Sequence, residues 1–337
     1  MLKLEKFLLA MAAFSIVVAA TSCQQQNKQY FFNQGVVWTT EFHIKYEATA
    51  NLNDSIQQVF KAVDESASAF NKQSRITAIN DNKSDVADAF FVKLYNKALE
   101  VNRASEGLYD PTVMPLVNAW GFGYKNGELP TKVQIDSILQ FVGMEHTSLH
   151  GKKIVKDDPR VQFDFSSIAK GMACDEVAAM LERNGVENYM VEIGGEVVAR
   201  GVNHLGQIWH VSIDMPEPDA DDGAQHTSAL VIELDSLAVA TSGNYRKFKE
   251  SGGKKLSHIV NPKTGDSETS NLLSVSIVAL DCMSADAWAT ACMAMGEEKT
   301  KSMMNEKTQL GVMTISVDAD GNYVIWSNKR FADLVAD

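Results

Sequence analysis

The chain has 337 residues, 45% of them hydrophobic and 22% charged, with 7 prolines and 21 glycines. This composition excludes a long disordered or collagen-like chain, and the length permits two domains or one mixed domain of about 300 residues. Acidic residues outnumber basic ones by 43 to 31, and this net charge of -12 disfavours electrostatic binding to nucleic acid or to an anionic membrane surface, so we expect no nucleic-acid partner.

The N-terminus has the features of an export signal. Lys3 and Lys6 precede an apolar run over residues 7–20, which has the length of a secretory signal and is too short for a comfortable transmembrane helix. We therefore expect residues 1–22 to be a signal peptide and the mature protein to be exported.

A cysteine closes this segment. The residues Ala20-Thr21-Ser22-Cys23 and the polar run after them resemble a bacterial lipobox, although Ala20 stands where Leu is usual. The resemblance implies that Cys23 is lipidated and anchors the protein to a periplasm-facing membrane surface. Residues 23–34 would then be a polar tether and residues 35–337 a soluble domain. An ordinary cleaved signal is the alternative.

Hydrophobic periodicity predicts the first elements of the domain. Alternation of apolar and polar residues over 36–46 indicates a half-buried strand. Apolar residues at helical spacing indicate amphipathic helices over 52–70 and 86–101. A capping box at Thr131 and Gln134 predicts a third helix that ends near residue 141.

The second half of the sequence is richer in strands. A helix is expected to begin near Ile168 and end at Gly185, and another to run over 285–295. The acidic stretch 214–227 is expected to be a solvated loop. Strands are predicted at 189–193, 208–213, 230–234 and 272–280 and around Val312 and Val324. This order predicts an α+β fold with a mostly antiparallel sheet.

The cysteines after Cys23 do not indicate a metal site. Cys174, Cys282 and Cys292 form no CxxC pair and have no histidine at ligand spacing. Because all three lie in apolar helical segments, we expect buried thiols that pack in the core.

Three short motifs match the set used by penicillin-binding serine enzymes. They are Ser167-Ile168-Ala169-Lys170, Ser242-Gly243-Asn244 and Lys263-Thr264-Gly265. The second and third are too close together for the helical subdomain between them, and Asn261-Pro262 makes the last motif a turn. We therefore reject this interpretation.

A different set of residues suggests a cation site. Asp286 and Thr290 are four residues apart, so both lie on one face of the expected helix and can offer two hard oxygen ligands to one cation. An aspartate that only stabilises the helix N-terminus is the alternative.

Several longer motifs together resemble those of the ApbE-type flavin transferases. They occur in the order of that family, from about Gly35 to the C-terminus. The motifs are Gly107-Leu108-Tyr109-Asp110-Pro111-Thr112-Val113 with Trp120-Gly121-Phe122-Gly123, Asp164-Phe165-Ser166-Ser167-Ile168-Ala169-Lys170-Gly171, Glu192-Ile193-Gly194-Gly195-Glu196, Ala240-Thr241-Ser242-Gly243-Asn244-Tyr245, Ser257-His258-Ile259-Val260-Asn261-Pro262-Lys263-Thr264-Gly265, and Ala285-Asp286-Ala287-Trp288-Ala289-Thr290 ending at Met295-Gly296.

The resemblance implies a single α+β domain with flanking helices and a magnesium-dependent activity. Such an enzyme splits FAD, attaches FMN through a phosphoester to a Ser or Thr of an exported protein, and releases AMP. The implied metal ligands are Asp286, Thr290 and the backbone carbonyl of Ser167. The implied FAD-binding residues are Trp38, Phe70, Leu108, Tyr109, Asp110, Asp164, Lys170 and His258.

Two departures from the family pattern bear on the flavin site. The usual Met-Gly-Thr is Trp38-Thr39-Thr40 in this chain, and the usual Asp before the later Pro is Asn261. Trp38 can stack on the flavin, or it can be a core aromatic.

The chemistry assigns two further roles. Lys170 is expected to add a positive charge at the FAD phosphates, unless it is a solvated lysine at a helix start. His258 is the candidate base for the attacking hydroxyl, with a structural hydrogen-bonding role as the alternative.

Three functions remain open on the sequence. The first is FMN transfer to membrane-anchored redox subunits that carry the acceptor Ser or Thr. The second is hydrolysis of FAD to FMN and AMP by the same fold and metal. The third is a lipoprotein that binds FAD without catalysis, which the pair Asp286 and Thr290 disfavours.

Overall fold

The computed structural model describes residues 27–123, 129–216, 227–244, 248–251, 254–267 and 270–336. The expected signal peptide, Cys23 and most of the expected acidic loop, residues 217–226, lie outside the described residues. In the part of the chain that the structure describes, no helix combines the length and apolar character needed to cross a membrane.

An eight-stranded sheet forms the centre of the described structure, with the order β1-β2-β5-β6-β9-β12-β13-β14 and every neighbouring pair antiparallel. Its strands are β1 (Gln29–Val37), β2 (Thr40–Ala48), β5 (Tyr189–Ile193), β6 (Glu196–Arg200), β9 (Leu237–Gly243), β12 (Leu272–Ala279), β13 (Gly311–Val317) and β14 (Tyr323–Ser327). Three antiparallel ribbons accompany it. They pair β3 (Thr147–His150) with β4 (Lys153–Lys156), β7 (Trp209–Asp214) with β8 (Ser228–Leu234), and β10 (Phe248–Ser251) with β11 (Lys254–Ser257).

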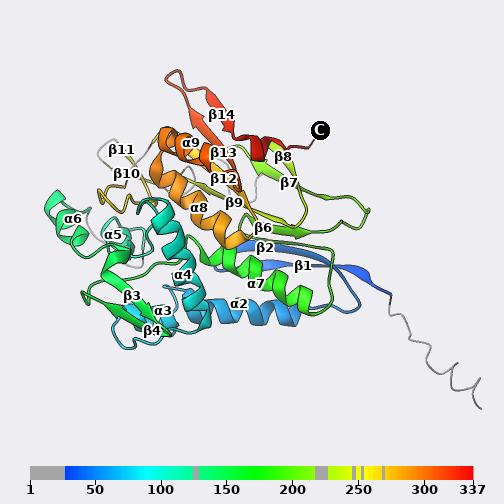
Figure 1. Cartoon of the computed structure of the whole chain (residues 1–337), viewed down its shortest axis with the longest axis horizontal. Coiled ribbons are helices and arrows are strands. Elements are labelled where there is room, and N and C mark those ends of the chain that lie inside the picture. The colour runs from blue at the N-terminus through cyan, green and yellow to red at the C-terminus, as the bar shows by residue number, and fades with distance from the viewer. Residues whose placement is uncertain are drawn as a thin grey trace, which may run out of the picture.

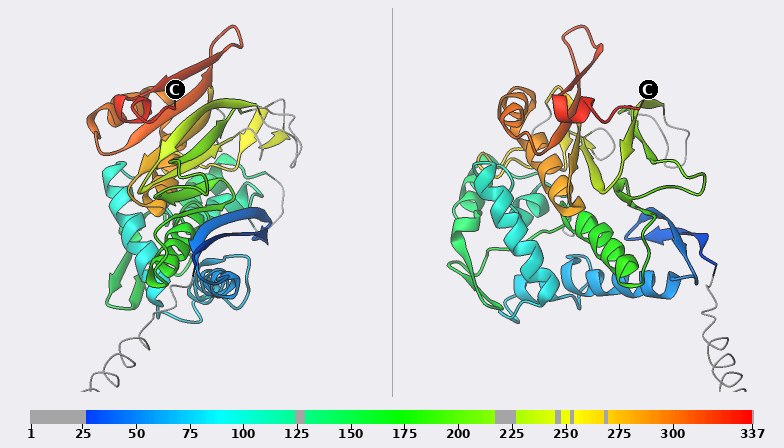
Figure 2. Two further views of the ribbon diagram at one scale, coloured as in Figure 1. Left: turned by 90° about the vertical axis from the view of Figure 1, so that its right-hand side faces the viewer. Right: turned by 45° about the vertical axis from the view of Figure 1, so that its right-hand side comes forward.

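Helices cover one face of the sheet (Figures 1 and 2). The long helices α7 and α8 contact each other and the central strands, and α2 and α4 pack outside them. The helices are α2 (Asn53–Ala67), α3 (Arg75–Asn80), α4 (Ala89–Ala104), α5 (Met114–Ala119), α6 (Lys132–Leu139), the 3-10 helix η1 (Met144–His146), α7 (Ala169–Arg183), α8 (Cys282–Met295), α9 (Glu297–Glu306) and α10 (Lys329–Ala332).

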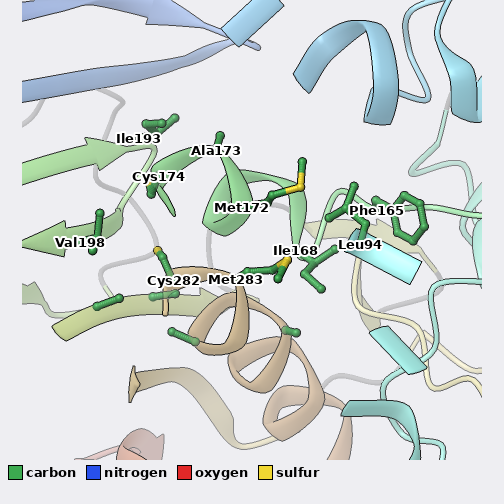
Figure 3. Packing of buried hydrophobic residues seen from close by; sticks show 14 of the residues in the cluster. Leu94, Phe165, Ile168, Met172, Ala173, Cys174, Ile193, Val198, Cys282 and Met283 are labelled. Atoms are coloured by element: carbon green, nitrogen blue, oxygen red, sulfur yellow. The ribbon is translucent and has the colours of Figure 1, made fainter. Parts of the chain in front are cut away.

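The central strands of the sheet are buried on both faces. Along β6, Val198 packs into the core beneath the helices, whereas Val197 and Ala199 face a second core with Trp209 of β7. Figure 3 shows the first core where α7 meets α8, with Met172 and Cys174 close to the start of α8. The expected single α+β domain with a mostly antiparallel sheet and flanking helices is confirmed.

Several expected elements have the predicted limits within two or three residues. The capping box of Thr131 and Gln134 is present and opens α6. The predicted strand 189–193 is β5, and α7 ends just before Gly185, whose φ is 75°. The expected helix over 52–70 ends at Ala67, however, because Ser68 is already extended.

The predicted strand over 36–46 is wrong. It is a hairpin whose turn lies at Trp38 and Thr39, both with positive φ, 49° and 64°. Across this two-residue turn, even-numbered residues of one strand pair with odd-numbered residues of the other, so the even-numbered residues of β1 and β2 lie on opposite faces. Phe42 is therefore buried, whereas Val36 faces outward and is 72% exposed. The expected boundary of the domain at residue 35 is also wrong, because β1 already begins at Gln29, inside the expected tether.

Candidate active site

A buried carboxylate marks the centre of the site. Asp286, in the second turn of α8, is only 3% exposed, and its Oδ2 accepts a hydrogen bond of 3.0 Å from the backbone N–H of Gly171 in α7. Burial raises the pKa of the Asp286 carboxyl, against the lowering effects of Lys170 and of the Gly171 N–H. A carboxylate in this position is stabilised by any further cation that binds beside it.

A salt bridge lies next to Asp286. The Lys170 Nζ is 2.5 Å from each carboxylate oxygen of Glu196 and 3.5 Å from the carbonyl oxygen of Gly194. The Glu196 side chain is 3% exposed and that of Lys170 is 33% exposed. Burial tends to lower the pKa of Lys170, but Glu196 and Asp286 outweigh it and hold the pKa above its ordinary value. Lys170 is therefore a charged group that still reaches the surface, and it is not the solvated lysine of the alternative interpretation.

The hydroxyl groups of the site come from two elements. Thr290 lies one turn beyond Asp286 on α8, and its Oγ1 is 3.1 Å from the Oγ of Ser242 at the end of β9. The i, i+4 spacing predicted from the sequence thus places Asp286 and Thr290 along one face of α8.

A buried tyrosine connects the segment before α7 to the cluster. The Ser167 hydroxyl donates to the Tyr109 hydroxyl at 3.2 Å, and the backbone N–H of Asp164 donates to the carbonyl of Pro111 at 2.6 Å. Burial raises the pKa of Tyr109 far above its ordinary value, and Asp286 and Asp164 raise it further. Tyr109 is therefore a neutral hydroxyl close to both carboxylates.

The Asp110 carboxylate accepts hydrogen bonds from the protein itself. Its Oδ1 accepts from the N–H and the hydroxyl of Thr112, at 2.8 and 2.6 Å, and its Oδ2 accepts from the N–H of Met144 at 3.0 Å. These bonds fix the loop that carries Tyr109 and the buried Leu108.

The remaining expected FAD-binding residues lie on other segments. Trp38 sits in the β1–β2 turn, where its ring meets Phe60 edge-on at 5.7 Å between centroids. Phe70 follows α2 and is 64% exposed. His258 follows β11, with its ring 6.5 Å from that of Phe122.

Tight packing joins the Trp38 turn to the cluster. At Gly194, which has a φ of 62°, a Cβ would lie 2.7 Å from the Oγ1 of Thr40. The Gly194 carbonyl also accepts from Lys170. Thr40 therefore packs directly on the turn that Lys170 contacts, and a glycine is required there by both its φ and the space.

The rejected serine-enzyme motifs do not assemble. Ser167 bonds to Tyr109 and Lys170 to Glu196, and the last motif is a turn in which the Gly265 N–H bonds to the carbonyl of Asn261 at 2.8 Å.

Sequence reasoning missed two members of the cluster. Glu196 and Ser242 stood in recognised motifs but received no role. For Glu196, a carboxylate directly after two glycines and at the start of an apolar strand was the available signal.

Comparisons with known proteins identify the family of the chain. Residues 38–314 match the model of the ApbE family. The FAD:protein FMN transferase of Vibrio cholerae is 33% identical over 322 residues, 92% of this chain and 94% of that protein, and the enzyme of the same name from Haemophilus influenzae is 31% identical, with 98% and 99% covered. The structure of the flavin transferase ApbE from Vibrio cholerae superposes with a TM-score of 0.81 at 31% identity, covering 91% of this chain and 99% of that one. The apo structure of the flavinyl transferase ApbE from Pseudomonas stutzeri superposes with a TM-score of 0.80 at 26% identity, covering 92% of this chain and 98% of that one. The chain belongs to the ApbE family.

Proposed function

We infer that the chain is an enzyme that transfers FMN from FAD to a protein, as its relatives do, and we propose that the reaction requires magnesium and releases AMP. The observation that carries the proposal is the buried Asp286 carboxylate, which lies beside the Lys170–Glu196 salt bridge and within one helical turn of Thr290. Two relatives named for this activity match 92% and 98% of the chain.

The donor atoms at Asp286 fit magnesium. Gly171 lies in the first turn of α7, where a backbone N–H has no acceptor within the helix, and its N–H donates to Asp286. The Ser167 carbonyl lies just before the N-cap residue Ile168, outside the hydrogen-bond ladder of α7. The Asp286 carboxylate, the Ser167 carbonyl and the Thr290 hydroxyl are all hard oxygen ligands. Across the described ranges, no three His, Cys, Asp or Glu side chains are grouped to hold a metal ion. A magnesium ion at Asp286 would keep several positions for water and substrate phosphates.

A bound magnesium ion would neutralise charge on the pyrophosphate as AMP leaves and would orient the reacting phosphorus. The protein residues bind the FAD phosphates and orient the groups that contact them. Glu196 holds the Lys170 ammonium at the site, where it can meet a phosphate oxygen, and the neutral Tyr109 hydroxyl supports Ser167. The bond from phosphorus to the AMP oxygen breaks, and a bond from phosphorus to the acceptor hydroxyl oxygen forms.

The acceptor hydroxyl must lose a proton in this step. We assign that task to His258, which follows a short ribbon and lies against Phe122. Trp38 and Phe70 are the aromatic groups assigned to the flavin, since the turn of Trp38 packs on the Gly194 turn that Lys170 contacts and Phe70 is exposed.

We also propose that the protein is exported, lipidated at Cys23 and anchored at a periplasm-facing membrane surface, and that its acceptors are membrane-anchored redox subunits. The support is the sequence of residues 1–29. A radiolabelled palmitate incorporation that Cys23→Ser abolishes would test the anchor.

Mass spectrometry of an acceptor tests the proposed function. The protein, FAD and magnesium are incubated with a peptide that contains one Ser or Thr. A mass increase equal to FMN minus water, absent with EDTA and absent when the hydroxyl residue is replaced by Ala, supports the proposal. FAD consumption without any labelled peptide would instead favour hydrolysis.

A further inference from the structure

An aspartate outside the proposed ligand set joins the two helices of the site. Asp175 lies in the middle of α7, but its carboxylate binds the start of α8. Its Oδ1 accepts from the backbone N–H of Cys282 at 2.8 Å, and its Oδ2 accepts from that of Met283 at 2.9 Å. The first N–H groups of a helix have no partner within the helix, so Asp175 supplies the acceptors that α8 lacks.

A carboxylate of α8 makes the corresponding contact with the start of α7. Asp286 of α8 accepts from the N–H of Gly171, in the first turn of α7. Each helix therefore places one carboxylate on the first turn of the other, and together the two carboxylates accept three backbone N–H groups across the helix pair.

The two backbones touch where these bonds form. A Cβ at Gly171 would lie 2.4 Å from the carbonyl oxygen of Cys282 and 2.8 Å from the Cα of Met283. Figure 3 shows Cys174 of α7 near Cys282, and Ile168 beside Met283, at the start of α8. The start of α8 therefore has little freedom to shift relative to α7 while the Asp175 bonds are intact.

We propose that Asp175 is a positioning residue, which fixes the start of α8 against α7 and so holds Asp286 and Thr290 in register with the Ser167 carbonyl. The proposal rests on the magnesium site proposed above. Asp286 follows Cys282 by four residues and Thr290 follows it by eight, so one rigid helix carries both ligands. Ser167 precedes α7 directly. A change in the α7–α8 contact would therefore move Asp286 and Thr290 of α8 away from the Ser167 carbonyl at the start of α7.

The test measures metal affinity in the full-length protein without FAD. Mn2+ serves as the probe, and the free Mn2+ signal in electron paramagnetic resonance gives its Kd. In Asp175→Asn the side chain keeps its size, but its amide group faces one of the two N–H donors and cannot accept from it. We expect the Kd for Mn2+ to rise about tenfold or more, the usual effect of losing a group that orients metal ligands.

Asp281→Ala is the matched control. Asp281 caps the same helix end, accepting from the N–H of Ser284 at 2.7 Å, but it makes this bond within its own segment. The control thus removes one negative charge and one cap without loosening α7 from α8, and its Kd should stay within twofold of wild type. A Kd for Asp175→Asn less than threefold above that of the control would overturn the proposal.

Two further variants keep the outcomes distinct. Asp286→Asn should lose Mn2+ binding. If it binds like wild type, the proposed metal site fails rather than the role of Asp175. If Asp175→Asn does not fold, as judged by circular dichroism, Asp175→Glu replaces it under the same threefold criterion, because the longer carboxylate keeps its charge but changes the helix spacing.

Discussion

At the residue scale, the site combines charges that are individually unfavourable to bury. Asp286 and Glu196 lie within a few per cent of full burial, and Lys170 is the cation between them. Removing one member of a buried charge pair leaves its partner uncompensated, which costs more than the pair contributes to stability. The cluster is thus suited to a second cation, and the residue that most directly depends on that cation is Asp286.

Asp286 should be essential for transfer but not for folding. We expect Asp286→Ala and Asp286→Asn to abolish FMN transfer at limiting magnesium. Asp286→Ala should also lower the free energy of unfolding by about 1–3 kcal/mol, because the Gly171 N–H loses its acceptor, whereas Asp286→Asn keeps an acceptor oxygen. Acceptor labelling and urea unfolding provide the two measurements. Near wild-type transfer by either variant would remove Asp286 from the ligand set.

Trp38 is predicted to lie against the flavin ring. FAD should then quench tryptophan fluorescence, and Trp38→Met, which restores the residue usual in the family, should reduce the quench while keeping FAD binding. Trp38→Ala should weaken FAD several-fold, since aromatic stacking contributes on the order of 1 kcal/mol. Only the difference from wild type is informative, because the chain has 5 tryptophans. Unchanged affinity and quench in Trp38→Ala would make Trp38 a core residue that packs on Phe60.

At the scale of elements, helices and strands are predictable from the sequence where their signals lie in neighbouring residues. The capping box at Thr131 and the strand 189–193 depend on neighbouring residues, and both were predicted. The turn at Trp38 and Thr39 lacks the Gly, Asn or Asp that marks such hairpins, so the alternation on either side of it predicts one continuous strand.

Partners that are distant in the sequence were not predictable from local patterns. Lys170 meets Glu196 across 26 residues, and Asp175 meets Cys282 across 107. Before the fold is known, a carboxylate such as Asp175 in the middle of an amphipathic helix looks like any other polar residue of that helix. The family motifs place Lys170, Asp286 and Thr290 in one site, but only the structure shows that the Asp110 carboxylate accepts from both Thr112 and the distant Met144.

The β1–β2 turn stores strain that a glycine would relieve. Thr39 is β-branched and has a φ of 64°, a conformation that costs non-glycine residues about 1–2 kcal/mol. After the entropy cost of glycine, Thr39→Gly should raise the free energy of unfolding by about 0.5–1 kcal/mol. Glu41→Gly, at an exposed position in the adjacent extended strand, is the control and should lower it. Equal destabilisation by both variants, measured by urea unfolding, would contradict the turn geometry.

At the scale of the whole molecule, one sheet with helices on one face and a ribbon on the other buries all three described cysteines. Burial raises the pKa of each thiol, that of Cys292 to about 12, which keeps the thiols protonated. Since the thiolate is the reactive form, the folded Cys23→Ser variant should react very slowly with Ellman's reagent at pH 8. All three thiols should react after unfolding in guanidinium. A thiol that reacts rapidly in the folded protein would show that a helix of the core opens.

The central claim is that this fold transfers FMN to a protein hydroxyl rather than to water. The most direct test is the ratio of AMP released to FMN attached to the acceptor, measured in one reaction with limiting FAD and magnesium and excess acceptor. Transfer predicts one AMP for each labelled acceptor and no free FMN. Release of AMP with an equal amount of free FMN and no labelled acceptor would contradict the account.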